Sequence, residues 1–143
     1  SWQSTNYCLK IGDCRLKTGT RRLKMSDFRD LVVYKKAFAL AMKIFEITKS
    51  FPKEEKYALT SQLKRSASSV PANIAEGRGR GGSKEFCRFL YIARGSLEES
   101  KSHLLLAKEL GYIDESDIIG LEEKTERLGA MLNNLIVRIQ KSI

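Results

Sequence analysis

Four segments in which apolar residues recur at steps of three and four constrain this chain more than any other feature. That spacing places the apolar residues on one face of an α-helix, whereas a β-strand would need strict alternation. The segments cover about residues 26–51, 54–77, 83–110 and 114–143. Because short connections join them, the sequence predicts an all-α fold, an antiparallel up-down-up-down four-helix bundle.

The predicted core is the stripe of apolar or small residues on each helix. From the first helix to the fourth, the stripes are Leu31, Tyr34, Phe38, Ala41, Phe45 and Thr48; Thr60, Leu63, Ala67, Val70 and Ile74; Phe86, Leu90, Ala93, Leu97, Ser100, Leu104 and Ala107; and Ile118, Leu121, Thr125, Leu128, Leu132, Leu135 and Ile139. The second stripe is built from the smaller residues. We therefore expect a neighbouring helix to approach it closely.

Pro71 lies inside the second predicted helix. A proline in a helix interior removes one hydrogen bond and costs about 3 kcal/mol. The helical pattern resumes afterwards at Ile74, so we expect a kinked second helix rather than a helix end. Ser66, Ser68 and Ser69 flank the proline, and their hydroxyl groups are expected to bond the carbonyl groups that the bend frees.

Predicted helix ends follow from local signals. Ser26 or Asp27 is a candidate cap for the first helix, which closes before Pro52. Two acidic residues, Glu54 and Glu55, are expected to open the second helix, where they favour its dipole. The glycine-rich run 77–82 is expected to end it. Ser83 is predicted to cap the third helix, Gly111 to follow its end, and Asp114 to begin the fourth.

The 143 residues suffice for one domain with a core, and their net charge of +9 is unevenly divided. Residues 1–24 hold six Lys and Arg against one Asp, a net +5, and the remaining 20 Lys and Arg against 16 Asp and Glu give +4. We interpret residues 1–24 as a basic leader outside the core fold and residues 25–143 as the bundle domain. A basic balance favours polyanionic partners such as nucleic acid.

Neither an apolar run of membrane length nor a secretory signal occurs in the sequence, so no membrane partner and a cytoplasmic location are expected. Cys8, Cys14 and Cys87 are odd in number and unsuitably spaced for a disulfide framework or a paired zinc site. They are predicted to be free thiols.

The sequence offers little support for a catalytic site. A carboxylate-bridged di-metal site in a bundle needs Glu-x-x-His pairs from two helices, but Glu99 and His103 stand alone and four apart. A serine nucleophile needs an adjacent base. Glu76 has no partner acid or base in its own stretch and is assigned a structural role, such as pairing with an arginine. The sequence therefore predicts no catalytic residue, no metal, no cofactor and no enzyme.

The run GRGRGG at residues 77–82 fits the pattern GxGxxG, but it follows a helix instead of a strand, which argues against a nucleotide site. A second interpretation is a basic loop at a helix N-terminus, where free amides favour phosphate. The candidate nucleic-acid-binding residues are Lys64, Arg65, Arg78, Arg80, Lys84 and Arg88. The alternative, a solvated turn whose glycines serve only geometry, stays open.

The predicted helices carry more apolar residues than one buried stripe per helix can hold. Leu105 and Leu106 accompany Leu104, and similar clusters occur at residues 31–33 and 135–137. Some of these side chains must face away from the core. Several such residues on extended helices favour a subunit interface, so a homo-oligomer is expected.

Three motifs identify a family: LTSQL at residues 59–63, PANIAEG at 71–77 and ARGSLE at 93–98. With their surroundings they strongly resemble the bacterial four-helix bundle family encoded in intervening sequences of large-subunit (23S) ribosomal RNA genes. The similarity covers about residues 28–140. That family is similar to the accessory variability determinant of diversity-generating retroelements, a basic, nucleic-acid-binding pentamer. The resemblance implies a ring of five bundles.

The combined expectation is a cytoplasmic, non-enzymatic, homo-oligomeric bundle that binds RNA or DNA through a basic surface with little base specificity. The alternative is a protein–protein interaction scaffold with no nucleic-acid role, on which the arginines only improve solubility.

Overall fold

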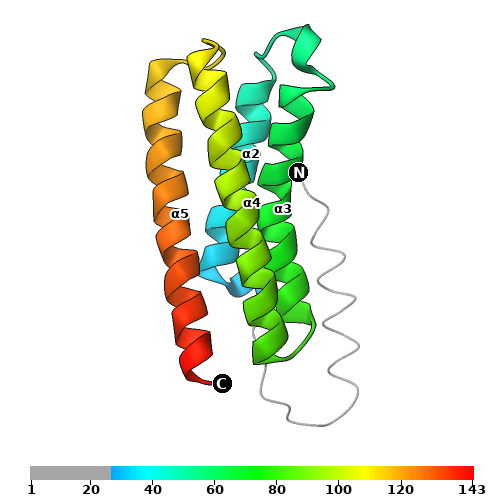
Figure 1. Ribbon diagram of the computed structural model, residues 1–143, viewed down its shortest axis with the longest axis vertical. Helices are drawn as coiled ribbons and strands as arrows, with labels where there is room; N and C mark the ends of the chain where they lie inside the picture. Colours follow the sequence, from blue (N-terminus) through cyan, green and yellow to red (C-terminus); the bar gives the residue numbers. More distant parts are fainter. Residues whose placement is uncertain (1–26) are drawn as a thin grey trace.

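The computed structural model describes residues 27–143, which form four long helices packed around one core (Figure 1). They are α2 (Val32–Thr48), α3 (Leu59–Gly79), α4 (Ser83–Glu109) and α5 (Glu115–Lys141). Two 3-10 turns, η1 (Phe28–Asp30) and η2 (Lys53–Glu55), precede α2 and α3. No strand occurs in this part of the chain, so the prediction of an all-α fold is confirmed. The predicted leader lies outside the described residues.

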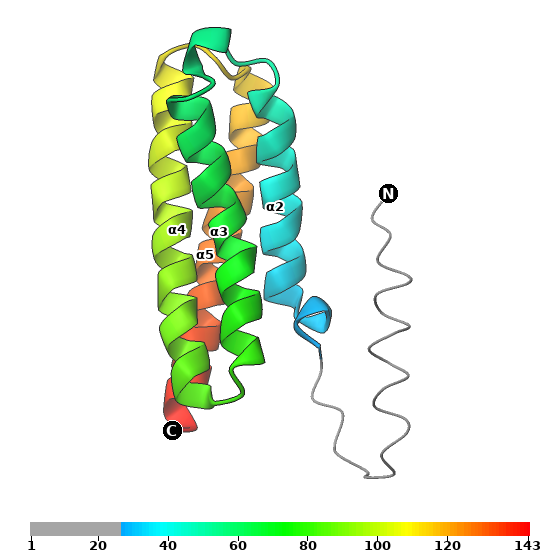
Figure 2. The ribbon, with the colours of Figure 1, turned by 90° about the vertical axis from the view of Figure 1, so that its right-hand side faces the viewer.

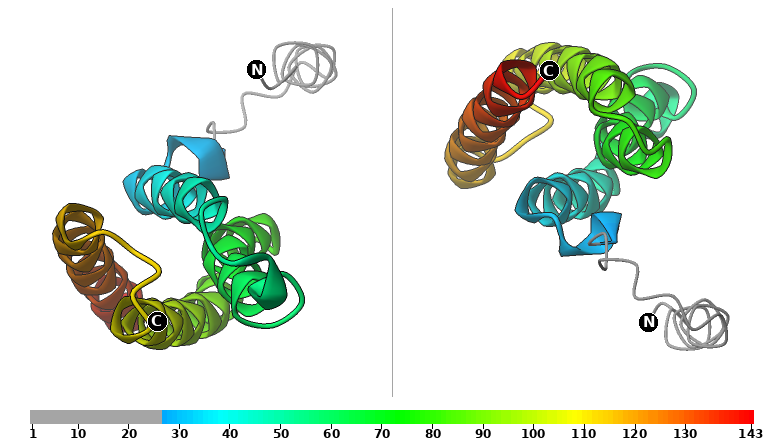
Figure 3. Two further views of the ribbon diagram at one scale, coloured as in Figure 1. Left: turned by 90° about the horizontal axis from the view of Figure 1, so that it is seen from above. Right: turned by 90° about the horizontal axis from the view of Figure 1, so that it is seen from below.

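Each helix packs against its neighbours in the sequence, and α5 also packs against α2. Viewed along the long axis, the helices follow one another around the core in chain order (Figure 3). One end of the bundle carries the α3–α4 connection, together with the start of α2 and the end of α5 (Figures 1 and 2). We call this the turn end.

The predicted stripe of α2 is partly wrong. Its buried residues are Val33, Ala37, Leu40, Ala41, Ile44, Ile47 and Thr48. Phe45, predicted to be in the core, is 37% exposed. Apolar residues cover more than half of this helix, so spacing alone fits several adjacent stripes. Residues from η1 influence which stripe faces inward, because Phe28 contacts the ring of Tyr34, which stacks on Phe38 at a centroid distance of 6.0 Å.

The stripes predicted for the other three helices match the core closely. Their buried members are Leu63, Ala67, Val70, Ile74, Phe86, Leu90, Ala93, Leu97, Ser100, Ala107, Ile118, Leu121, Thr125, Leu128 and Leu132. At the end of α5 the buried residue is Ile136, whereas Leu135 and Ile139 are half-buried. This drift follows from the helical period of 3.6 residues, which a stripe of strict heptads does not match.

Helix α3 begins and ends later than predicted. Glu54 and Glu55 belong to η2, and α3 continues through Gly77 as far as Gly79. The turn is therefore shorter, and it depends on Gly81, whose φ of +82° favours glycine. Gly82 rather than Ser83 is the N-cap of α4, with no side-chain hydrogen bond.

The end of α4 follows the prediction. Gly111 has φ +77° directly after the C-cap residue Leu110. Its N–H donates to the carbonyl of Lys108 and that of Tyr112 to the carbonyl of Ala107, both at 2.9 Å. This is the pattern by which a glycine terminates a helix. Asp114 then serves as N-cap of α5, although its side chain makes no capping hydrogen bond.

The expected role of the serines beside Pro71 is wrong. Ser66 and Ser68 donate to the carbonyl groups three residues before them, at 3.1 Å each, and Ser69 bonds the hydroxyl of Ser96. None of them reaches the carbonyl of Ala67, which lost the N–H of residue 71. A helical serine reaches only carbonyls three or four residues earlier, so that carbonyl would need a serine at position 70 or 71.

Candidate nucleic-acid interface

Four of the six predicted binding residues lie around the α3–α4 connection. Arg78 is in the last turn of α3, Arg80 is its C-cap, and Lys84 and Arg88 are in the first two turns of α4. The prediction that the two earlier arginines sit at a helix N-terminus is therefore wrong, because α3 continues to Gly79. Only their side chains extend over the first turns of α4.

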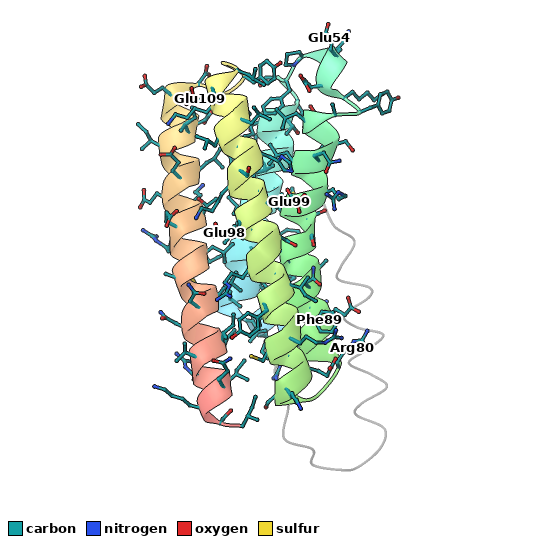
Figure 4. All side chains as sticks on the ribbon, in the orientation of Figure 1. Glu54, Arg80, Phe89, Glu98, Glu99 and Glu109 are labelled. Carbon is teal, nitrogen blue, oxygen red and sulfur yellow. The ribbon has the colours of Figure 1, made fainter. Side chains whose placement is uncertain are left out.

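Phe89 organises this cluster. The guanidinium carbon of Arg80 lies 5.0 Å from the centroid of the Phe89 ring, and that of Arg88 lies 4.9 Å from it. The ring itself is buried, at 6% exposure. Figure 4 shows Arg80 and Phe89 together at the turn end. Because a cation above an aromatic face is attracted by about 0.5–1 kcal/mol at exposed sites, the ring attracts one arginine from the end of α3 and one from α4.

Both of these arginines also contact a carboxylate on their own helix. Arg80 pairs with Glu76 at 2.9 Å, as anticipated for that glutamate, and Arg88 with Glu85 at 3.3 Å. All four side chains are about half exposed. Such surface pairs contribute about 0–1 kcal/mol, so a phosphate group could replace the carboxylates. Lys84 is exposed and has no carboxylate within 4 Å in the described part of the chain.

Lys64 and Arg65 are not brought to this cluster. They precede Arg78 by more than a dozen helical residues, which corresponds to about 20 Å along α3. The Lys64 ammonium lies 4.9 Å from the centroid of the Phe45 ring on α2. Arg65 instead pairs with Glu99 on α4 at 2.8 Å. The predicted six-residue patch is therefore divided.

Basic residues from α5 join the turn end, and the sequence interpretation missed them. Gln140 donates to the hydroxyl of Tyr91 at 2.6 Å, and Arg94 donates to Asn133 at 2.9 Å. These contacts place the last turns of α5 beside the first turns of α4. Arg138 and Lys141, in the last turn of α5, lie at the same end. The predicted alternation of helix direction was the signal that could have located them.

Charge is distributed asymmetrically along the bundle. The half nearest the turn end comprises residues 27–40, 70–96 and 128–143, with ten Lys and Arg against four Asp and Glu, a net +6. The other half, residues 41–69 and 97–127, has ten against twelve, a net −2. Glu54 and Glu109 mark the acidic far end in Figure 4. A polyanion would therefore be attracted to the turn end.

Other chemistry is sparse over residues 27–143. No group of three or more His, Cys, Asp and Glu side chains in this range could hold a metal ion. His103 lies 3.4 Å from the Glu99 carboxylate and is half-buried. Cys87 is a buried free thiol, while Cys8 and Cys14 lie outside the described residues. No helix in the same range is long and apolar enough to span a membrane.

Comparison with known proteins identifies relatives of this chain. A crystal structure of a protein with unknown function from the S23 ribosomal protein family of Bacteroides thetaiotaomicron VPI-5482 has the same fold. The TM-score is 0.66 at 22% sequence identity, over 73% of this chain and 98% of the other. No curated protein matches the chain. A family model described as 23S rRNA-intervening sequence protein matches residues 29–134, and the chain therefore belongs to that family.

Proposed function

We propose that this protein is a non-enzymatic, cytoplasmic homo-oligomer that binds RNA or DNA through the turn end with little base specificity. The proposal includes an antiparallel up-down-up-down bundle as the subunit, with a bend in α3 at Pro71, which lies inside that helix. The observation that carries the proposal is the net +6 of the half nearest the turn end against the net −2 of the other half.

The chemistry of the turn end suits phosphate groups. Guanidinium groups bind phosphate through charge-assisted hydrogen bonds. Those of Arg80 and Arg88 both lie near the Phe89 ring, at 5.0 and 4.9 Å from its centroid. Lys84 adds an exposed ammonium group. Contacts of this kind depend on charge and do not read base edges. The proposal therefore includes little discrimination between sequences.

Assembly would strengthen this binding. The resemblance to the accessory variability determinant of diversity-generating retroelements leads us to propose a pentamer. One patch alone would bind weakly, but several presented together raise the effective concentration of each further contact. Exposed apolar side chains support self-association, among them Leu105 at 57% and Leu106 at 50%.

The direct test is fluorescence anisotropy of a labelled single-stranded RNA across a salt series. Lys84→Ala with Arg88→Ala should weaken the binding of different sequences alike, because phosphate contacts do not read bases. The double variant should also flatten the log–log salt slope, to which each phosphate contact contributes about −0.7 for single strands. Lys53→Ala with Lys56→Ala removes the same charge at the far end, where both lysines are exposed, and is the matched control. Equal effects of the two double variants would exclude a localised interface at the turn end.

The exposed leucines of α4 also fit the alternative, a protein–protein interaction scaffold without a nucleic-acid role. The two functions separate in the same experiment. If the wild-type protein does not bind RNA or duplex DNA even at low salt, the scaffold function replaces nucleic-acid binding. Binding that weakens steeply as salt is added supports the interface proposed here.

A further inference from the structure

The outward face of α2 carries apolar side chains that no other element of the described chain covers. Val32 is 59% exposed, Met42 is 55% exposed, and Ala39 lies between them on the same face. Steps of three and seven residues keep these positions on one side of a helix. Lys35, Glu46 and Lys49 lie on the same face and are exposed. We call this the α2 face.

A groove of about 490 Å³ lies between α4 and α5. Its apolar lining includes Leu104, Ile113, Ile118 and Leu121. Leu105, which is 57% exposed, also lines the groove. An apolar groove that stays open to water offers a site for apolar side chains of another molecule. We call this the α4–α5 groove.

The two surfaces differ in charge. Residues 32–49, which are α2 and its C-cap residue, hold four Lys and one Glu, a net +3. Residues 97–127 around the groove hold four Lys and Arg and nine Asp and Glu, a net −5. The lysines of the groove are already engaged by acids. Lys101 lies 2.9 Å from Glu126, and Lys108 lies 3.3 Å from Glu122. Basic residues of a partner would therefore meet an acidic surplus.

The two surfaces also overlap along the long axis of the bundle. Lys43, the neighbour of Met42, pairs across the helices with Asp117 near the start of α5, at 3.6 Å. Lys108 of α4 pairs with Glu122, little more than one helical turn further along α5. The middle of the α2 face and the α4–α5 groove are thus at similar distances from the turn end. Copies standing side by side with parallel axes could bring the two surfaces together.

We propose that the α2 face of one copy docks in the α4–α5 groove of the next copy. This inference rests on the self-association in the proposed function and names the surfaces that produce it. The two surfaces differ, so the contact is heterologous, and each copy keeps one surface of each kind available until a ring closes. With parallel axes, the basic turn ends of all copies face the same side of the ring. A nucleic acid lying across that side would contact several copies.

Two single variants and their mixture test the contact. Met42→Glu places an acid against the acidic groove, and Leu105→Lys places a base against the basic α2 face. Both positions are more than half exposed, so far-UV circular dichroism should remain that of the wild type. Each variant alone should sediment with the mass of one chain, 16.2 kDa. Mixed, they should associate in equal amounts, because the intact α2 face of one variant meets the intact groove of the other.

Tyr57→Glu is the control, since Tyr57 is 86% exposed and lies outside both surfaces. It should keep the wild-type mass. If Met42→Glu lowers helical content, Ala39→Glu on the same face replaces it. Variants that both keep the wild-type mass, or a mixture that stays monomeric, would overturn the assignment of the surfaces. A wild-type chain that is monomeric at micromolar concentration would instead overturn the proposed self-association itself.

Discussion

The hydroxyl groups of Ser66 on α3 and Ser100 on α4 lie 2.9 Å apart in the core. Both residues are fully buried, at 1% and 0% exposure. Ser100 donates to Ser66, which in turn donates to the carbonyl of Leu63 at 3.1 Å. Buried polar groups must find partners or lose free energy. The Ser100 hydroxyl also lies 2.9 Å from the carbonyl of Ser96 on its own helix. The two hydroxyl groups meet only because α3 and α4 approach closely.

Ser100→Ala should lower the free energy of unfolding by about 1 kcal/mol, since it removes the one hydroxyl proton that Ser66 and the Ser96 carbonyl share. Ser66 keeps its bond to the Leu63 carbonyl, which limits the effect. Ser66→Ala with Ser100→Ala should cost less than the sum of the single changes, because the residues share one bond. Urea unfolding of all four proteins measures this coupling. Strictly additive effects would mean that the serines do not interact.

Gly77→Ala should destabilise the bundle by about 1–3 kcal/mol, the range for overpacking. A Cβ atom on Gly77 would lie only 2.5 Å from Cβ of Phe89, so α3 and α4 would have to separate. Gly95→Ala is the matched control within α4, because nothing lies within 4 Å of the added atom. That change should stabilise by up to about 1 kcal/mol through helix propensity. Thermal unfolding of both variants measures the two effects. An unfolding temperature of Gly77→Ala equal to that of the wild type would contradict the close approach of α3 and α4.

The helices were predictable because the local spacing of apolar residues specifies them. Which face of each helix is buried was less predictable. On α3, and over most of α4 and α5, polar residues separate the apolar positions, so one stripe predominates. On α2 the residues around Phe45 are apolar on several sides, so the buried stripe depends on contacts with α3 and η1, which spacing does not contain. Helix ends within the glycine run were also uncertain, because Gly77 is selected by the approach of Phe89 and not by a turn.

Pro71→Ala should leave a folded bundle with unchanged helical content. Alanine restores an N–H that can donate to the Ala67 carbonyl and removes the conflict of proline with a helix interior. The buried proline ring leaves a small cavity, which costs about 1 kcal/mol and offsets part of this gain. Far-UV circular dichroism and sedimentation of the variant test the prediction. Loss of helicity would show that the fold requires the proline.

The ion pairs of Lys101 should stabilise the fold at neutral pH and lose this effect at alkaline pH. Hydrogen bonding to Glu126, supported by Glu98, raises the pKa of its ammonium group above the usual value despite partial burial. Because the pKa of Lys101 is higher in the folded than in the unfolded chain, its charged form stabilises the fold. This stabilisation is complete below the unfolded pKa, about 10.4, and is lost as the pH rises through the folded pKa. Lys101→Met should therefore lower stability by about 1 kcal/mol at pH 7 and by less at an alkaline pH above the folded pKa.

Lys124→Met is the matched control for that experiment, since Lys124 is an exposed lysine of α5. It should change the unfolding free energy little at either pH. Urea midpoints at the two pH values give the comparison. A Lys101→Met effect that is equal at both would contradict the role of the two carboxylates.

The candidate site was predictable where residues are close in the sequence and not where the fold brings them together. Arg78, Arg80, Lys84 and Arg88 lie within eleven positions of one another, so a tight turn gathers them. Arg65 is on the same helix as Arg78, yet about 20 Å of α3 separates the two residues. Arg138 and Lys141 of α5 join the turn end only through contacts such as that between Gln140 and Tyr91. The alternation of helix direction is needed to foresee such contacts.

Arg80→Lys and Arg80→Ala should separate binding from structure. Lysine keeps the charge, so the salt slope should stay close to that of the wild type. It loses the planar contact with Phe89 and the paired hydrogen bonds of a guanidinium group, so RNA affinity and stability should each fall slightly. Alanine removes both and should reduce the slope by about 0.7 for one phosphate contact. Arg65→Ala, remote from the cluster, should leave the slope unchanged. Anisotropy titrations and urea unfolding of the three variants provide the measurements, and a wild-type slope in Arg80→Ala would assign this arginine a purely structural role.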